Sequence, residues 1–124
     1  MRRLLLMTMA LLLAGCTDSQ STDDWLRQLK DPDVVKRRQA IRELGVRMTE
    51  AERVTPSVAE ALRDENGYVR HDAALTLGKL GPAAKMAVPA LVAALKDQER
   101  GVRKAASQAL KRIDPKGVPK AGER

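Results

Sequence analysis

The sequence has 124 residues, a formal net charge of +7 and only two aromatic side chains, Trp25 and Tyr68. This length suits one small domain, and the scarcity of aromatic residues requires a core of Leu, Val, Ala and Ile. Cys16 is the only cysteine, which excludes an intramolecular disulfide.

Residues 1–15 have the layout of a secretory signal peptide. Arg2 and Arg3 precede an apolar run from Leu4 to Leu13, which is too short to anchor the chain across a bilayer. Removal of these residues lowers the formal charge from +7 to +5, because they contain two arginines and no acidic residue.

The signal ends in Leu13-Ala14-Gly15-Cys16, which resembles the lipobox of bacterial lipoproteins. The resemblance implies cleavage before Cys16, lipid attachment to that cysteine, and a lipid-anchored place in the bacterial cell envelope facing the periplasm. Thr17, where an aspartate would favour the inner membrane, favours the outer membrane. An ordinary signal peptide with an incidental cysteine is the alternative interpretation.

Two stretches of the exported chain are predicted to lie outside the folded domain. Residues 16–22, which begin with the lipidated cysteine, are small and polar and read as a flexible tether. Residues 114–124 contain two prolines and two glycines and almost no apolar side chain, which predicts a disordered basic tail. The folded domain is therefore expected to span 23–113.

A 33-residue period runs through this domain. The recurring residues are Leu29, Leu62 and Leu95; Asp31, Asp64 and Asp97; Arg37, Arg70 and Arg103; Ala40, Ala73 and Ala106; and Leu44, Leu77 and Leu110. A fixed period of this length indicates stacked copies of one structural unit. The copies span about 23–48, 55–81 and 88–113.

Each copy contains two stretches of helical periodicity separated by a short polar turn. In the third copy the two helical faces consist of Val88, Leu91, Val92 and Leu95, and of Val102, Ala106, Ala109, Leu110 and Ile113. No strand pattern appears in the sequence. The fold is therefore predicted to be all-α, a short α-solenoid of about three antiparallel helical hairpins.

The ends of the second helix in each copy carry recognisable signals. Asp33 and Asn66 are good N-cap residues, whereas Glu99 is a poorer one. Gly45 is expected to end the second helix of the first copy, and Gly78 with Gly81-Pro82 that of the second.

The segments VRHDAALTLGKLGPAAKMAVPALVAALKD (69–97) and AVPALVAALKDQERGVRKAASQAL (87–110) resemble HEAT repeats of the short bacterial type, also called PBS-lyase HEAT-like repeats. The resemblance covers roughly 23–113. In the first copy Lys36 stands where the others have valine, and Arg47 stands where they have leucine or isoleucine. An end unit has one face without a neighbour, so polar replacement there is physically reasonable, although it leaves the end of the first hairpin undefined.

The recurring acidic and basic residues of the turns are interpreted as structural. Resemblance to HEAT repeats implies that the aspartate of the turn and the arginine of the second helix pair within or between neighbouring hairpins. The resulting ladder would consist of Asp31, Arg37, Asp64, Arg70, Asp97 and Arg103.

Other cationic residues of the second helices are candidates for partner binding. In HEAT repeats these helices line the concave surface, where a basic stripe would attract an acidic partner. The candidates are Arg38, Arg42, His71, Lys79, Lys104, Lys111 and Arg112. The alternative is a solvated face that only keeps the protein soluble, and Glu43 and Asp72 interrupt the stripe.

The sequence offers little for catalysis or for cofactor binding. His71 is the only histidine, which is too few for a zinc site or a hydrolase triad, and no glycine-rich phosphate loop is present. We therefore expect no enzymatic activity, no cofactor and no metal, and a membrane-anchored scaffold that presents a basic surface to a protein partner. One alternative is an accessory subunit of an enzyme related in fold to bilin lyases. The other is a nucleic-acid-binding protein, which is disfavoured by the predicted export and by the lack of aromatic residues that could stack on bases.

Overall fold

Helices form all the regular secondary structure of residues 20–117, the part of the chain that the computed structural model describes. Six of them are α-helices: α2 (Thr22–Gln28), α3 (Val34–Leu44), α4 (Ala51–Glu60), α5 (Gly67–Leu80), α6 (Val88–Ala94) and α7 (Arg100–Ile113). Three are short 3-10 helices: η1 (Met48–Glu50), η2 (Ala61–Arg63) and η3 (Gly81–Ala87).

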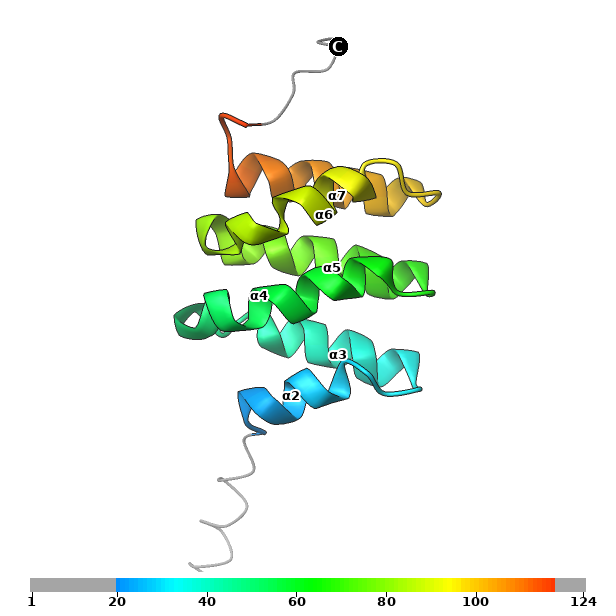
Figure 1. Cartoon of the computed structure of the whole chain (residues 1–124). Helices are drawn as coiled ribbons and strands as arrows, with labels where there is room; N and C mark the ends of the chain where they lie inside the picture. The colour runs from blue at the N-terminus through cyan, green and yellow to red at the C-terminus, as the bar shows by residue number, and fades with distance from the viewer. Residues whose placement is uncertain (1–19, 118–124) are drawn as a thin grey trace, which may run out of the picture.

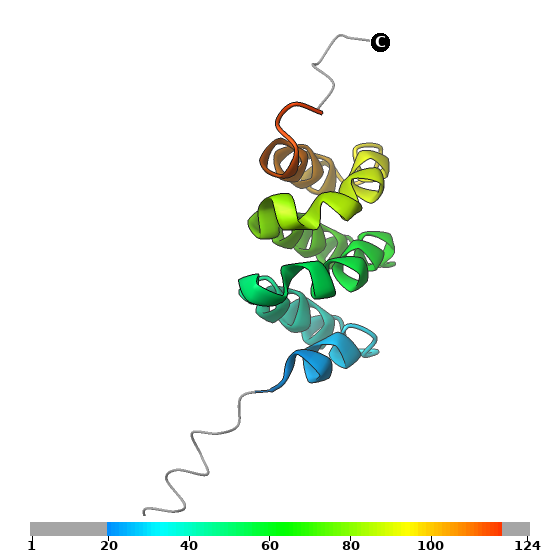
Figure 2. The ribbon, with the colours of Figure 1, turned by 60° about the vertical axis from the view of Figure 1, so that its left-hand side comes forward.

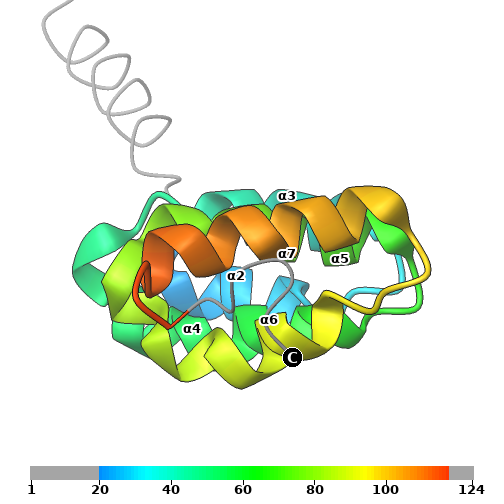
Figure 3. The same ribbon diagram turned by 90° about the horizontal axis from the view of Figure 1, so that it is seen from above.

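The helices form three stacked hairpins, α2–α3, α4–α5 and α6–α7 (Figures 1 and 2). Seen along the stack, the first helices α2, α4 and α6 form one layer and the second helices α3, α5 and α7 form another (Figure 3). The turns within the hairpins line one edge of the stack. This arrangement confirms the predicted all-α, short α-solenoid.

The second helices begin where the cap residues predict. The Asp33 carboxylate accepts a hydrogen bond from the backbone N–H of Val35 at 2.8 Å. Asn66 accepts from the N–H groups of Tyr68 and Val69 at 2.9 and 3.3 Å. Glu99 precedes α7 without a side-chain cap bond, so the third hairpin lacks this local stabilisation.

The first helix starts earlier than the tether prediction allows. Ser21 caps α2 in a reciprocal capping box with Asp24, and Thr22 is buried with its hydroxyl donating to Glu50 at 2.7 Å. The predicted tether, 16–22, is therefore two residues too long at its C-terminal end. The predicted signal, 1–15, the lipid site Cys16 and residues 118–124 of the predicted tail lie outside the described residues.

The end of the first hairpin differs from the ends of the others. α5 and α7 each run for 14 residues, and their last positions, Leu80 and Ile113, are buried. α3 ends after 11 residues at Leu44. Arg47 at the equivalent place cannot be buried as an apolar anchor, and its guanidinium instead donates to the carbonyl oxygen of Gln20 at 2.8 Å.

The core is continuous through the stack and consists of small and branched apolar side chains. Ile41, Leu44 and Leu77 are fully buried, and each such side chain contributes about 1.5–3 kcal/mol to folding. Trp25 is also buried, at the first hairpin, which assigns it to the core and not to a partner. The recurring alanines are fully buried as well: Ala40, Ala73 and Ala106.

Gly78 lies inside α5, so the prediction that it helps to end this helix is wrong. The close approach of α5 and α7 explains why glycine stands there. A Cβ atom on Gly78 would lie 3.2 Å from the Cα of Ala109, a contact too tight for an ordinary side chain. Gly45 stands one period earlier and faces Thr76 of α5 in the same way, with a Cβ 3.0 Å from its methyl group. Lys111 occupies the corresponding place on α7.

Candidate protein-interaction surface

The arginine of each second helix is fixed by the turn of its own hairpin. The Nη1 of Arg70 donates to the carbonyl oxygens of Asp64 and Glu65 at 2.8 and 3.1 Å. Arg37 makes the equivalent pair of bonds at 2.8 and 3.0 Å, and Arg103 makes it at 2.7 and 3.0 Å. Each guanidinium is therefore held in one orientation before any carboxylate is considered.

The remaining edge of the guanidinium binds the aspartate of the next hairpin. Arg37 binds Asp64 through Nε and Nη2 at 2.9 and 3.1 Å, and Arg70 binds Asp97 at 2.8 and 3.2 Å. The four side chains are between 8 and 13% exposed, so solvent screens these bidentate pairs only weakly. Of the two arrangements that the sequence left open, the structure shows pairing between hairpins.

The same aspartates also organise the turns. Asp31, Asp64 and Asp97 each accept a hydrogen bond from the backbone N–H two residues later, at 2.8 to 2.9 Å. Burial alone would raise the pKa of Asp97, but the hydrogen bonds from Arg70 and from the Glu99 N–H, with the charges of Arg70 and Arg103, hold that pKa below its ordinary value. Arg37, Asp64, Arg70 and Asp97 are thus committed to structure.

The second-helix face, which we define as the exposed side of α3, α5 and α7, carries most of the candidate residues. Arg38, His71 and Lys104 are separated by 33 residues and therefore occupy equivalent positions on three stacked helices (Figure 3). Arg42 lies one helical turn beyond Arg38 and is exposed. Lys79 and Arg112 share another row of equivalent positions near the C-terminal ends of α5 and α7.

Two features of this face differ from the predicted basic stripe. Asp72, which is buried, accepts a hydrogen bond from Arg38 Nε at 2.7 Å and lies 3.6 Å from His71 Nδ1. This carboxylate offsets the charge of Arg38, so the stripe is not continuous. Lys111 stands at the Gly78 position and therefore belongs to the C-terminal end of the stack instead of this face.

Tyr68 is the residue of this face that the sequence reasoning missed. Its side chain is 69% exposed, and the guanidinium carbon of Arg38 lies 5.3 Å from the centre of its ring. Val35, one period earlier, is 67% exposed. The 33-residue spacing of Val35 and Tyr68 at the solvent-facing edge of their helices was the signal that could have identified them.

A shallow groove of about 410 Å³ opens beside Tyr68, between the N-terminal ends of α5 and α7. Gly101 leaves space in it, since a Cβ there would approach only the ring of His71, at 3.6 Å. The lining residues are Asn66, Gly67, Tyr68, His71, Glu99, Gly101 and Val102. The face therefore combines an aromatic ring, cationic groups and a recess.

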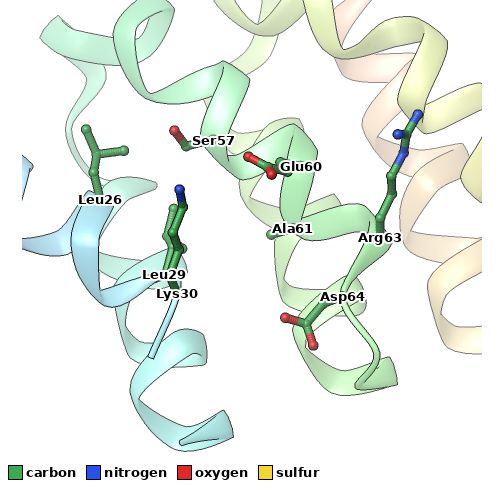
Figure 4. Close-up of a pocket in the computed structure, with 8 residues that line it drawn as sticks. All are labelled: Leu26, Leu29, Lys30, Ser57, Glu60, Ala61, Arg63 and Asp64. Carbon is green, nitrogen blue, oxygen red and sulfur yellow. The ribbon is translucent and has the colours of Figure 1, made fainter. Parts of the chain in front are cut away.

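A second groove, of about 330 Å³, lies on the opposite layer between α2 and the α4–η2 segment (Figure 4). Leu26 and Leu29 contribute apolar surface, while Lys30, Glu60 and Arg63 bring charges of both signs. Asp64 also lines this groove but is already bound to Arg37. Its mixed charge gives it less preference for one class of partner than the second-helix face has.

Within residues 20–117, His, Cys, Asp and Glu side chains do not gather in groups of three that could hold a metal ion. Over the same residues, every helix is too short or too polar to cross a bilayer.

Comparison with known proteins identifies the repeat. The family described as HEAT repeats matches residues 22–111, which confirms the resemblance predicted from the sequence. A chain in the complex of CpcE and CpcF of phycocyanin lyase from Nostoc sp. PCC7120 is similar, with a TM-score of 0.69 and 28% sequence identity. That match covers 77% of this chain but 38% of the other, so this chain spans well under half of its length. No curated protein matches by sequence.

Proposed function

Because this chain belongs to the HEAT-repeat family, we propose that it is a non-enzymatic interaction module that binds an acidic protein partner through its second-helix face. The observation that carries the proposal is the pair of Arg38 and Tyr68, an exposed aromatic ring beneath a guanidinium that Asp72 holds in place. Tyrosine and arginine are enriched among the residues that contribute most to binding energy at protein interfaces, and pre-ordered side chains lose little entropy on binding.

The charges around this pair favour an acidic partner. Arg42 and Lys104 are exposed and make no ion pair among the described residues, so they are available to a carboxylate. Val35 and the ring of Tyr68 supply the apolar contact that a purely electrostatic site lacks.

We propose further that Cys16 anchors the module by lipid in the bacterial cell envelope, facing the periplasm from the outer membrane. The support is the sequence Leu13-Ala14-Gly15-Cys16 after an apolar run. Anchoring would raise the local concentration of the module near envelope partners. In a Cys16→Ser variant we expect loss of membrane attachment and retention of the uncut signal; unchanged attachment would contradict the proposal.

A second candidate is an accessory subunit of an enzyme related in fold to bilin lyases. It is favoured by the structural likeness to a chain of the CpcE–CpcF complex. A bilin-attachment assay with phycocyanin apoprotein separates the two, because an interaction module should not raise the attachment rate.

The partner proposal is tested by photo-crosslinking in the envelope. The full chain carries a photoreactive phenylalanine in place of Tyr68, or in place of Met86, which is 61% exposed on η3 outside the second-helix face. We expect one discrete protein adduct from position 68 and none from position 86.

Charge reversal sharpens this experiment. Arg42→Glu and Lys104→Glu remove free cations without touching the Arg38–Asp72 pair, so the fold should persist. The adduct at position 68 should weaken at least about tenfold in the double variant. Equal adducts at both positions, or an adduct indifferent to charge reversal, would rule the proposal out.

A further inference from the structure

Arg103, the last arginine of the ladder, makes the hydrogen bonds to its own turn but has no aspartate partner among the described residues. Arg103 makes the same two carbonyl hydrogen bonds as Arg37 and Arg70, at 2.7 and 3.0 Å. In the two earlier hairpins the Nε–Nη2 edge so oriented binds a carboxylate. Among residues 20–117 no carboxylate accepts from that edge of Arg103.

Apolar surface is exposed on the first helix of the same hairpin. Val92 of α6 is 45% exposed and Leu95 is only partly buried, whereas Leu62, one period before Leu95, is buried. In the middle hairpin the equivalent surface of α4 and η2 is covered by η3 and α6 of the next hairpin, whose turn places Asp97 on Arg70. The C-terminal end of the stack thus repeats the surface that elsewhere receives a helix and an acidic turn.

Lys111 limits what can fit there. At the equivalent Gly78, helix α7 approaches so closely that a Cβ would lie 3.2 Å from its backbone. A lysine side chain prevents the same approach by a second helix. The free surface is therefore confined to α6 and the α6–α7 turn.

The surrounding charge selects the occupant. α7 carries Arg100, Arg103, Lys104, Lys111 and Arg112 and no acidic residue. A second copy stacked on this end would bring its α3 against α7. There it would present Lys36, Gln39 and Glu43, which stand where α7 has the apolar residues Val102, Ala105 and Ala109. A second copy of this chain therefore fits the end poorly.

We propose that the C-terminal end of the stack docks a helical segment of a different protein, with an aspartate seated on Arg103 and apolar side chains on Val92 and Leu95. This site is distinct from the second-helix face, so either proposal can fail without the other. The contact reproduces between two proteins the bidentate geometry that Arg70 makes with Asp97.

The test uses a peptide that reproduces the segment covering the middle hairpin. It spans residues 87–99, with blocked ends, and is titrated into the ¹⁵N-labelled full chain while the Arg Nε signals are followed by NMR. We expect the Arg103 Nε signal to shift with saturation and that of exposed Arg42 to stay in place. Replacement of Asp97 by Asn in the peptide, or Arg103→Gln in the protein, should weaken binding at least about tenfold.

Two other sources of the carboxylate are outcomes of the same experiment. Self-association of the chain that Asp31→Asn abolishes would overturn the proposal, because a second copy would then occupy the site. An Arg103 signal that shifts when the chain is truncated after Gly117 would also overturn it, because the chain's own C-terminal residues would supply the carboxylate. Equal binding of the Asp and Asn peptides would show that Arg103 is not the recognition residue.

Discussion

The middle and last hairpins present the same local structure to different surroundings. Arg70 and Arg103 are each held by two carbonyl groups of their own turn, yet only Arg70 meets an aspartate from a following hairpin. Gly78 admits a neighbouring helix, whereas Lys111 at the same position excludes one. The carbonyl groups of the turn therefore orient the arginine in both hairpins. Its Nε–Nη2 edge pairs with an aspartate only where another hairpin follows in the described stack.

The largest expected effect comes from removing the inner arginine. Arg70→Ala leaves the nearly buried Asp97 without its partner and should lower the free energy of unfolding by about 3–5 kcal/mol. Arg103→Ala removes only two hydrogen bonds to carbonyls and should cost about 1–3 kcal/mol. Urea unfolding followed by circular dichroism measures both, and equal losses would refute the distinction between the two hairpins.

A smaller effect is expected at the helix contact. Gly78→Val places a branched side chain against the backbone at Ala109 and should destabilise the fold by about 1–3 kcal/mol. Lys111→Val is the matched control and should change stability by no more than about 0.5 kcal/mol, because Lys111 is exposed. The comparison fails if the control loses as much stability as Gly78→Val.

The smallest effect is a pH dependence. The pKa of Asp97 lies below its ordinary value of 3.8, so its stabilising contribution is complete above that value and is lost as the pH falls through the lower, folded-state pKa. Wild type and Asp97→Asn should therefore differ in stability at pH 7 and converge in strong acid. A difference that stays constant between these conditions would argue against a role for this carboxylate's charge.

Local signals in the sequence predicted the fold well. The 33-residue period located the hairpins, and Asp33 and Asn66 marked the starts of α3 and α5 because caps act within one turn of helix. The early start of α2 was missed although Ser21 and Asp24 form a capping box, which is a local signal. Thr22 is held in addition by a contact with Glu50, 28 residues away. Contacts of that range leave no mark in local composition.

The candidate surface was predicted less completely. Arg38, His71 and Lys104 were found from their charge, but the neutralising contact of Asp72 with Arg38 joins residues 34 positions apart and depends on how the helices stack. Tyr68 was overlooked because a single aromatic residue in a helical pattern is usually core. Lys111 was grouped with the stripe, although the 33-residue period places it at the position of Gly45 and Gly78, which face the neighbouring hairpin.

The central claim is that Arg37 and Arg70 each tie their own hairpin to the next one. A double-mutant cycle for Arg70→Ala and Asp97→Ala measures it directly, with Arg70→Ala and Asp64→Ala as the pair within one hairpin. We predict a coupling free energy of about 1–3 kcal/mol for Arg70 with Asp97, and less than about 0.5 kcal/mol for Arg70 with Asp64. A stronger coupling within the hairpin than between hairpins would contradict the account.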